Sequence, residues 1–442
     1  MKRRFWIEFS LLFPLFLLLA NSFLFLSSAP ALLWLWVPLF LLLNILPGIF
    51  SLTTQYKRLK VCYHGAMLLS MFAVSLFLTV VLHLVLGTFL LPGKGLLWLW
   101  SALLAVGVHF VLFWNGMLSV YLTSLQLGIK QRVIGALCGL IPIVNLVILN
   151  RIIRICLKEV SFETQKEQQN RTRSSQRICA TRYPILMVHG VFFRDSLRFN
   201  YWGRIPGELE RNGAQVYYGN HQSAASVADS AAELTARIQE ILEETGAEKV
   251  NIIAHSKGGL DCRYAMAKLG MSPYVASLTT VNTPHIGCIF ADYLLFIIPE
   301  KVKNKVAATY NKTLRKLGDH DPDFLAAVQD LTASGCAALN REMPMPEGVF
   351  CQSIGSVLTK ATSGKFPMNL AFALVKHFDG ENDGLVAERA FAWGEKYTLL
   401  RPTGKRGISH GDMIDMNREN IPDFDVREFY VSLVAELKDK GL

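Results

Sequence analysis

Long apolar segments fill the first third of the chain, whereas the remainder alternates short apolar segments with amphipathic ones. Four of the long segments contain about 20 residues or more, the length that a helix needs to cross a bilayer. These four segments are residues 5–26, 31–52, 66–91 and 96–123. The pattern therefore predicts an all-α transmembrane region over residues 1–150.

A fifth apolar run, residues 133–150, is shorter and contains Pro142 and Asn145. We expect it to be re-entrant or interfacial, with a fifth span as the alternative. A cleavable signal peptide is the alternative for the first run, because that run follows three bases. Its length and the closely following second run favour a span.

The charges are divided unevenly along the chain. Residues 1–150 contain nine bases and a single acid, Glu8, and so carry most of the formal net charge of +10. Clustered bases between apolar runs are typical of loops at anionic lipid headgroups and do not indicate nucleic-acid binding. Glu8, His83 and His109 raise the alternative of an ion path, although lone histidines on apolar helices usually find a partner within a helix.

Bases in short loops predict the orientation, because cytoplasmic loops are enriched in Lys and Arg. By this rule the N-terminus and residues 57–60 and 130–132 lie inside, and Lys94 lies outside. A basic linker, residues 151–182, follows. We therefore expect a multi-pass protein of the cell membrane whose C-terminal domain, residues 183–442, faces the cytoplasm; a fifth span would place that domain outside.

The hydrophobic period changes at the start of the C-terminal domain. The predicted strands are residues 183–188, 215–218 and 250–254, and the predicted helices are residues 205–212, 227–245 and 260–269. Alternating strands and helices predict a parallel sheet with helices on both faces.

A candidate nucleophile lies in the segment AHSKGG, residues 254–259, between a predicted strand and a predicted helix. This is the context of a nucleophile elbow, in which serine occupies a tight strand-to-helix turn and its near neighbours must be small. Ala254 stands where glycine is more usual. A structural turn is the alternative, but the flanking strand and helix favour Ser256 as a nucleophile.

The acid and the base are expected after the serine, in the order Ser, Asp or Glu, His. His410 is the only histidine after the acidic loop at residue 383, so we expect it to be the general base. Asp383 is the expected acid that orients His410, with Asp379 and Glu381 as alternatives. His189 precedes the serine and is not the expected base.

Two backbone amides are candidates for an oxyanion hole. Gly190 would let the loop after the first strand pass close to Ser256, which would position the amide of Val191. The amide of Lys257, at the start of the helix after Ser256, would be the second donor.

Together these segments resemble the bacterial triacylglycerol lipases of the Pseudomonas and Burkholderia type. The matching stretches are YPILMVHG (183–190), YWGRIP (201–206), NGAQVY (212–217), KVNIIAHSKGG (249–259), VNTPHIG (281–287) and NDGLV (382–386). The resemblance extends over residues 183–415. It implies an α/β-hydrolase fold, a triad of Ser256, Asp383 and His410, and Val191 and Lys257 as oxyanion donors.

The same resemblance implies a structural calcium ion. Asp412, two residues after the base, matches one ligand of that ion, but Ser363 stands in the region of the other ligand, and no aspartate lies between it and Asp379. We therefore expect no cofactor and no metal. The eight cysteines form no CxxC pair and no metal-ligand spacing, and we expect buried free thiols.

These observations predict a membrane-anchored serine carboxylic-ester hydrolase that acts on lipid acyl esters. The expected partners are a lipid or ester substrate and the membrane. A phospholipase or an acyltransferase with the same triad is one alternative, and a non-catalytic lipid-binding sensor or scaffold is another. Residues 289–378 form an insertion whose apolar stretch 293–299 precedes three lysines. It is expected to be a lid that opens on lipid, or else a core helix of the cap.

Overall fold

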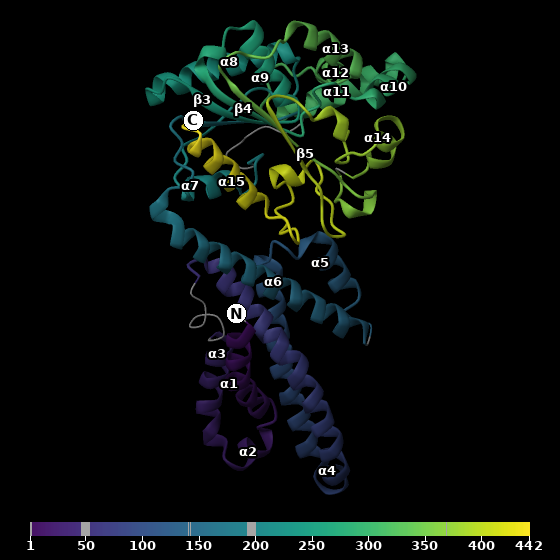
Figure 1. Ribbon diagram of the computed structural model, residues 1–442. Helices are drawn as coiled ribbons and strands as arrows, with labels where there is room; N and C mark the ends of the chain where they lie inside the picture. The colour runs from purple at the N-terminus through teal and green to yellow at the C-terminus, as the bar shows by residue number, and fades with distance from the viewer. Residues whose placement is uncertain (1, 46–53, 140, 142, 192–199, 368) are drawn as a thin grey trace. The chain divides into compact units, whose positions relative to one another are not determined.

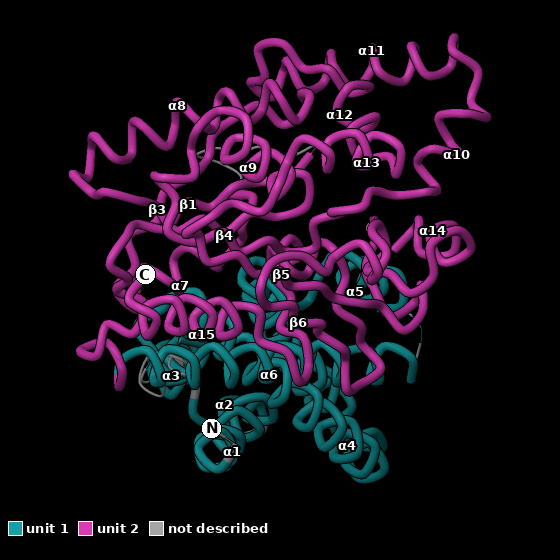
Figure 2. Tube along the Cα trace, turned by 45° about the horizontal axis from the view of Figure 1, so that its top comes forward, with its two compact units in different colours: residues 1–171 teal, residues 172–442 magenta. Residues whose placement is uncertain are grey.

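The computed structural model describes residues 2–45, 54–139, 141, 143–191, 200–367 and 369–442. The chain forms two compact units, residues 1–171 and residues 172–442, which Figure 2 distinguishes by colour.

The N-terminal unit is built from helices (Figure 1). Its helices are α1 (Lys2–Ala20), α2 (Phe23–Ser28), α3 (Leu33–Ile45), α4 (Lys57–Thr123), α5 (Gly128–Leu137) and α6 (Val144–Arg173). Within the described residues, α4 is the one helix long and apolar enough to cross a membrane, and Trp34–Ile45 is a shorter apolar helix. The first predicted span is divided between α1 and α2, and the end of the second lies outside the described residues.

Helix α4 folds back on itself. Its helical dihedrals break at Lys94 (φ −137°, ψ 38°), and the indole nitrogen of Trp98 donates to the carbonyl oxygen of His83 at 2.9 Å. Further from the turn, a Cβ added to Gly65 would lie 2.8 Å from the carbonyl oxygen of Gly116, so the two halves pack closely through small residues. The two halves coincide with the predicted segments 66–91 and 96–123.

Two histidines of α4, His83 and His109, have partners within the helix. His83 contacts the carbonyl oxygen of Thr79 at 3.1 Å, and His109 contacts that of Ala105 at 2.7 Å. These contacts favour a structural role for the two side chains over a role in an ion path.

The predicted linker is largely helical, because α6 continues to Arg173. No glycine or proline interrupts residues 144–173, and the pair Glu167–Arg171, one turn apart at 2.6 Å, stabilises the exposed end. The fifth apolar run is divided between α5 and α6. Its Pro142 lies outside the described residues.

The C-terminal unit contains a six-stranded sheet in which every pair of neighbouring strands is parallel. The strands are β1 (Ile185–Val188), β2 (Val216–Tyr218), β3 (Val250–His255), β4 (Val275–Val281), β5 (Phe350–Ser356) and β6 (Lys396–Leu400), in the order β2-β1-β3-β4-β5-β6. Ile185 pairs with Val216 on one side and with Asn251 on the other, so β1 is interior. This arrangement is the α/β-hydrolase fold.

Helices cover both faces of the sheet. Successive strand residues point to opposite faces, so each face has a core of its own. Ile185 and Met187 belong to the core under α7 (Ile205–Arg211) and α15 (Val426–Asp439). Leu186 and Val188 belong to the core under α8 (Val227–Thr245) and α9 (Lys257–Lys268).

The insertion between β4 and β5 is helical (Figure 1). It comprises α10 (Ile289–Ile297), α11 (Glu300–Lys316), α12 (Phe324–Asp330) and α13 (Ala333–Glu342), and α14 (Phe372–Asp379) follows β5. All eight cysteines of the chain are free, and all but Cys138 are buried.

Candidate active site

Ser256 occupies the turn between β3 and α9. Its backbone has φ 54° and ψ −129°, a left-handed conformation that side chains other than glycine rarely adopt. The amide of Ser256 donates to the carbonyl oxygen of Val281 on β4 at 2.9 Å, so the neighbouring strand holds this conformation. This is the geometry of a nucleophile elbow, a strained strand-to-helix turn that exposes the serine hydroxyl at the edge of the sheet.

The residues around Ser256 are small because other backbone segments approach it closely. A Cβ added to Gly258 would overlap the carbonyl oxygen of His189, and one added to Gly190 would lie 2.8 Å from the Ser256 Cβ. Ala254 is fully buried in the core beneath α8 and α9. The loop after β1 therefore passes directly beside Ser256, as the sequence predicts.

His410 and Asp383 contact each other through their side chains. The Nδ1 of His410 donates to the Oδ2 of Asp383 at 2.7 Å, and the amide of His410 donates to the Asp383 carbonyl oxygen at 3.0 Å. The Oδ1 of Asp383 accepts from the amides of Leu385 and Val386 at 2.9 and 2.8 Å. Asp383 is fully buried, so these donors replace water around its charge.

Asn282 is a further partner of this carboxylate that the sequence analysis did not single out. Its Nδ2 donates to the Oδ2 of Asp383 at 2.6 Å and to the hydroxyl of Ser356 at 2.8 Å. Asn282 follows β4 with φ 49°, a conformation that asparagine tolerates better than most residues. The only signal in the sequence was its position within the matching stretch VNTPHIG.

The two alternative acids lie elsewhere. Asp379 pairs with Arg389 and accepts from the amide of Phe290 at the start of α10 at 3.2 Å. Glu381 is exposed and pairs with Arg401 at 2.8 Å. Neither contacts His410, so Asp383 is the carboxylate that the fold brings to the histidine.

Tyr201 and His255 connect the two loops of the site behind Ser256. The amide of Gly190 donates to the Tyr201 hydroxyl at 3.0 Å, and that hydroxyl contacts the Nδ1 of His255 at 2.7 Å. The Nε2 of His255 in turn contacts the carbonyl oxygen of His410 at 3.2 Å. Burial, together with the neighbouring His410, lowers the pKa of His255 well below its usual range, so this ring stays neutral.

The predicted oxyanion donors flank the serine. Val191 is buried and follows Gly190, and the residues after it lie outside the described part of the chain. Lys257 is the first residue of α9, and the N-terminus of a helix favours a nearby negative charge. Its side chain is occupied elsewhere, since its Nζ donates to Asp261 at 2.6 Å and to Ser230 at 2.9 Å.

An apolar cavity of about 380 Å³ opens at the serine. Ser256, His410 and Val191 lie on its wall, and about half of the other lining residues are apolar residues of α10, α11 and α12. Leu294 and Val302 are examples. His189 is not part of this wall; its ring nitrogens contact backbone carbonyl oxygens.

The residues that the lipase resemblance assigns to calcium do not fit a metal ion here. Asp412 accepts from the Nη2 of Arg406 at 2.8 Å, and the Nη1 of the same guanidinium donates to the carbonyl oxygen of Ser363 at 2.8 Å. A fixed positive charge already lies among these oxygens. Within the described residues, no group of three or more His, Cys, Asp and Glu side chains could hold a metal ion.

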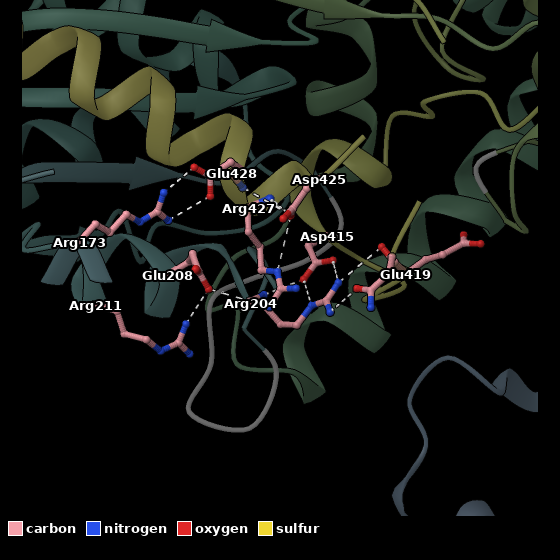
Figure 3. A network of polar contacts seen from close by, with 10 residues as sticks. Arg173, Arg204, Glu208, Arg211, Asp415, Glu419, Asp425, Arg427 and Glu428 are labelled. Carbon is pink, nitrogen blue, oxygen red and sulfur yellow. Dashed lines mark hydrogen bonds and ion pairs between the residues drawn. The ribbon is translucent and has the colours of Figure 1, made fainter. Parts of the chain in front are cut away.

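A second arginine holds the segment after His410. Arg204, just before α7, donates to both carboxylate oxygens of Asp415 at 2.7 and 2.8 Å and to the side-chain oxygen of Asn420 at 2.8 Å (Figure 3). A bidentate arginine–carboxylate pair fixes orientation as well as distance. The histidine loop is therefore fastened to the core on the α7 side.

The chain is similar to known ester hydrolases. Residues 214–324 match the family model described as "Putative serine esterase (DUF676)". A triacylglycerol lipase of Pseudarthrobacter phenanthrenivorans is 38% identical over 178 residues, which are 37% of this chain and 55% of that protein. A triacylglycerol lipase of Vibrio cholerae is 33% identical over 238 residues, which are 48% of this chain and 75% of that protein.

The chain thus spans about half of the first of these relatives and three quarters of the second. Among solved structures, the mature lipase BlEst2 of Bacillus licheniformis matches with a TM-score of 0.43 and 23% identity, over 58% of this chain and 92% of that chain.

Proposed function

Because the chain belongs to the triacylglycerol lipase family of serine ester hydrolases, we propose that it cleaves carboxylic esters of lipid-like acids through Ser256, His410 and Asp383. The observation that carries this proposal is that Ser256 and His410 line the same cavity. The elbow serine and the histidine lie on one apolar wall, and the histidine is hydrogen-bonded to a buried carboxylate.

The reaction proceeds in two steps. The Nε2 of His410 takes the Ser256 hydroxyl proton while the serine oxygen attacks the ester carbonyl, and the amides of Val191 and Lys257 stabilise the oxyanion. The imidazolium then gives its proton to the leaving alkoxide, which departs as an alcohol and leaves an acyl-serine. Water, deprotonated by the same histidine, releases the acid and restores the serine.

Asp383 keeps His410 in the useful tautomer. The carboxylate accepts the Nδ1 proton, so the Nε2 lone pair is free to face the serine. The two backbone amides and Asn282 hold that carboxylate in place before substrate arrives.

The cavity wall favours an acyl chain over a polar acid. Its volume of about 380 Å³ lies in the range of small-molecule sites, and the apolar side chains of α10 and α11 contribute one side of it. Phe296 on α10 is 88% exposed, so this helix presents apolar side chains on the cavity side and on the outside as well. Such a helix suits a lid over a lipid substrate.

The experiment that tests the activity is substitution of the nucleophile. Ser256→Ala should abolish hydrolysis of p-nitrophenyl butyrate and labelling by a fluorescent fluorophosphonate, while the exposed Ser175→Ala keeps both. Full turnover by purified Ser256→Ala would refute the assignment. A panel of triacylglycerols and phospholipids, with water or an alcohol as acceptor, separates lipase from phospholipase and acyltransferase.

We also infer that the N-terminal unit anchors the enzyme in the cell membrane with several spans, and that the hydrolase faces the cytoplasm. The apolar α4 and the nine bases of residues 1–150 support this. Alkaline phosphatase or a cytoplasmic fluorescent protein fused after Leu442 tests the orientation. An active phosphatase with a dark fluorescent fusion would place the enzyme outside.

A further inference from the structure

The guanidinium of Arg406 lies among four oxygen acceptors. Its Nη1 donates to the carbonyl oxygens of Ser363 and Gly407 at 2.8 and 2.6 Å. Its Nη2 donates to the carboxylates of Asp412 and Glu419 at 2.8 and 2.9 Å. The side chain is only 16% exposed, so these contacts lie largely away from water. Arg406 thus joins Ser363, which lies 43 residues earlier in the chain, to Glu419, which lies 13 residues later.

Asp412 transmits this contact to the histidine loop. While its Oδ1 binds Arg406, its Oδ2 accepts from the amide and the hydroxyl of Ser409, both at 2.7 Å. Ser409 directly precedes His410, whose position decides whether its Nε2 can reach Ser256. Moving Arg406 would release Asp412, and through it the turn that carries the base.

The four acceptors are of the kind that a hard divalent cation prefers. Calcium binds carboxylate and carbonyl oxygens in an adaptable geometry and completes its shell with water, whereas magnesium demands a stricter octahedron. Two carboxylates and two carbonyl oxygens converge here, and a guanidinium stands where such an ion would bind. Lys365 is a second cation that pairs with a carboxylate of this cluster, at 2.9 Å from Glu419.

The charges in this cluster are mutually compensating. Burial would lower the pKa of Arg406, but Asp412 and Glu419 outweigh it and raise that pKa, so the guanidinium is permanently charged. Burial would raise the pKa of Glu419, but Arg406 and Lys365 lower it. With two cations and two anions the cluster is neutral, and losing the arginine would leave one negative charge in excess.

We propose that Arg406 is a built-in substitute for a structural metal ion, which positions the His410 loop without calcium, and that removing its side chain uncovers a calcium site. Arg406 is a positioning residue, because it acts on the base through Asp412 and Ser409. This role rests on the proposed function, whereas the metal-binding consequence does not need turnover.

The test uses the purified full chain in detergent, with either EGTA or calcium chloride present. The wild type and the control Arg401→Ala, whose arginine is more than half exposed, should show equal kcat and equal melting temperature in both buffers. In EGTA, Arg406→Ala should lose about 10- to 100-fold in kcat with little change in KM, since substrate contacts are intact. Calcium should restore kcat in part and raise the melting temperature of this variant alone, and magnesium should do so less well.

Arg406→Lys supplies a second, milder perturbation. A lysine carries one compact ammonium and cannot reach all four acceptors at once, so its kcat should lie between those of the wild type and Arg406→Ala. If Arg406→Ala folds only when calcium is present, the proposal is supported, and if it folds in neither buffer, the lysine variant decides by its kcat relative to the wild type.

Three results would overturn the proposal. The first is inactivation or destabilisation of the wild type by EGTA. The second is an unchanged kcat in Arg406→Ala or Arg406→Lys. The third is a melting temperature of Arg406→Ala that is the same with and without calcium. If the wild type hydrolyses no ester, the proposed function fails, but the calcium response of the melting temperature still tests the site.

Discussion

At Gly190, a single added methyl group should lower catalytic activity far more than it lowers the stability of the fold. A Cβ added there would lie 2.8 Å from the Ser256 Cβ, 3.0 Å from the Tyr201 hydroxyl and 3.2 Å from the His255 carbonyl oxygen. Nonbonded carbon atoms prefer about 3.5–4.0 Å, so the loop or the elbow must give way by roughly 1 Å. The residue that would move with Gly190 is Val191, the proposed oxyanion donor.

The two costs of Gly190→Ala differ in kind. Overpacking a well-filled site typically destabilises the fold by about 1–3 kcal/mol. A displacement of about 1 Å at reacting groups lowers the rate by about 100-fold. We therefore expect a folded protein with a modestly lower melting temperature and a kcat/KM that falls far more than its stability.

The assay measures kcat and KM with p-nitrophenyl butyrate, the rate of fluorophosphonate labelling and thermal unfolding. Gly207→Ala on α7 is the matched control, because its new methyl would lie 3.6 Å from Arg211, an ordinary contact. If Gly190→Ala is folded and labels and turns over like the wild type, the close approach of the β1 loop to the nucleophile is wrong.

Three further predictions follow from other contacts. Tyr201→Phe leaves the buried amide of Gly190 and the Nδ1 of His255 without the hydroxyl, so it should cost about 1–3 kcal/mol in chemical denaturation and lower kcat; unchanged values would contradict the connection between the two loops. The pKa of Glu419 is lowered in the folded state, so its contribution to stability is present above the unfolded pKa of about 4.3 and is lost as the pH falls through the folded pKa. Glu419→Gln should therefore make stability depend less on pH on the acid side. An unaltered curve of stability against pH would argue against the pair with Arg406. A fragment of residues 172–442 should be soluble and hydrolyse p-nitrophenyl butyrate, because both faces of its sheet are covered by its own helices; aggregation under all conditions would contradict two separable units.

Local signals located the secondary structure well where helix ends are marked in the sequence. The helix expected at residues 227–245 is α8 with the same bounds, since Ser226 caps its start by accepting from the amide of Asp229 and Gly246 ends it with φ 67°. The polar residues after 150 predicted a linker, yet most of them continue α6. Composition there indicates exposure and not the absence of a helix, and only the lack of glycine and proline favoured helix.

Chain order placed the expected acid and base after Ser256, because this fold takes both from later loops, and the structure brings Asp383 and His410 into contact. It could not select the residues that hold them. Asn282 is 101 positions from Asp383, and Arg406 is 43 positions from Ser363. Such contacts depend on how distant loops meet at the sheet edge, and no spacing rule along the chain encodes them.

If the N-terminal unit spans a membrane as we propose, the reversal of α4 at Lys94 determines how the chain enters the bilayer. Two apolar arms joined at a tight bend can insert together, so that the bend and the charge of Lys94 are the only parts that need to reach the far surface. Both ends of α4 then remain on the surface from which they started. The side on which the enzyme works is therefore decided by the segments that precede and follow α4, and deleting the whole of Lys57–Thr123 should leave the hydrolase on its original side.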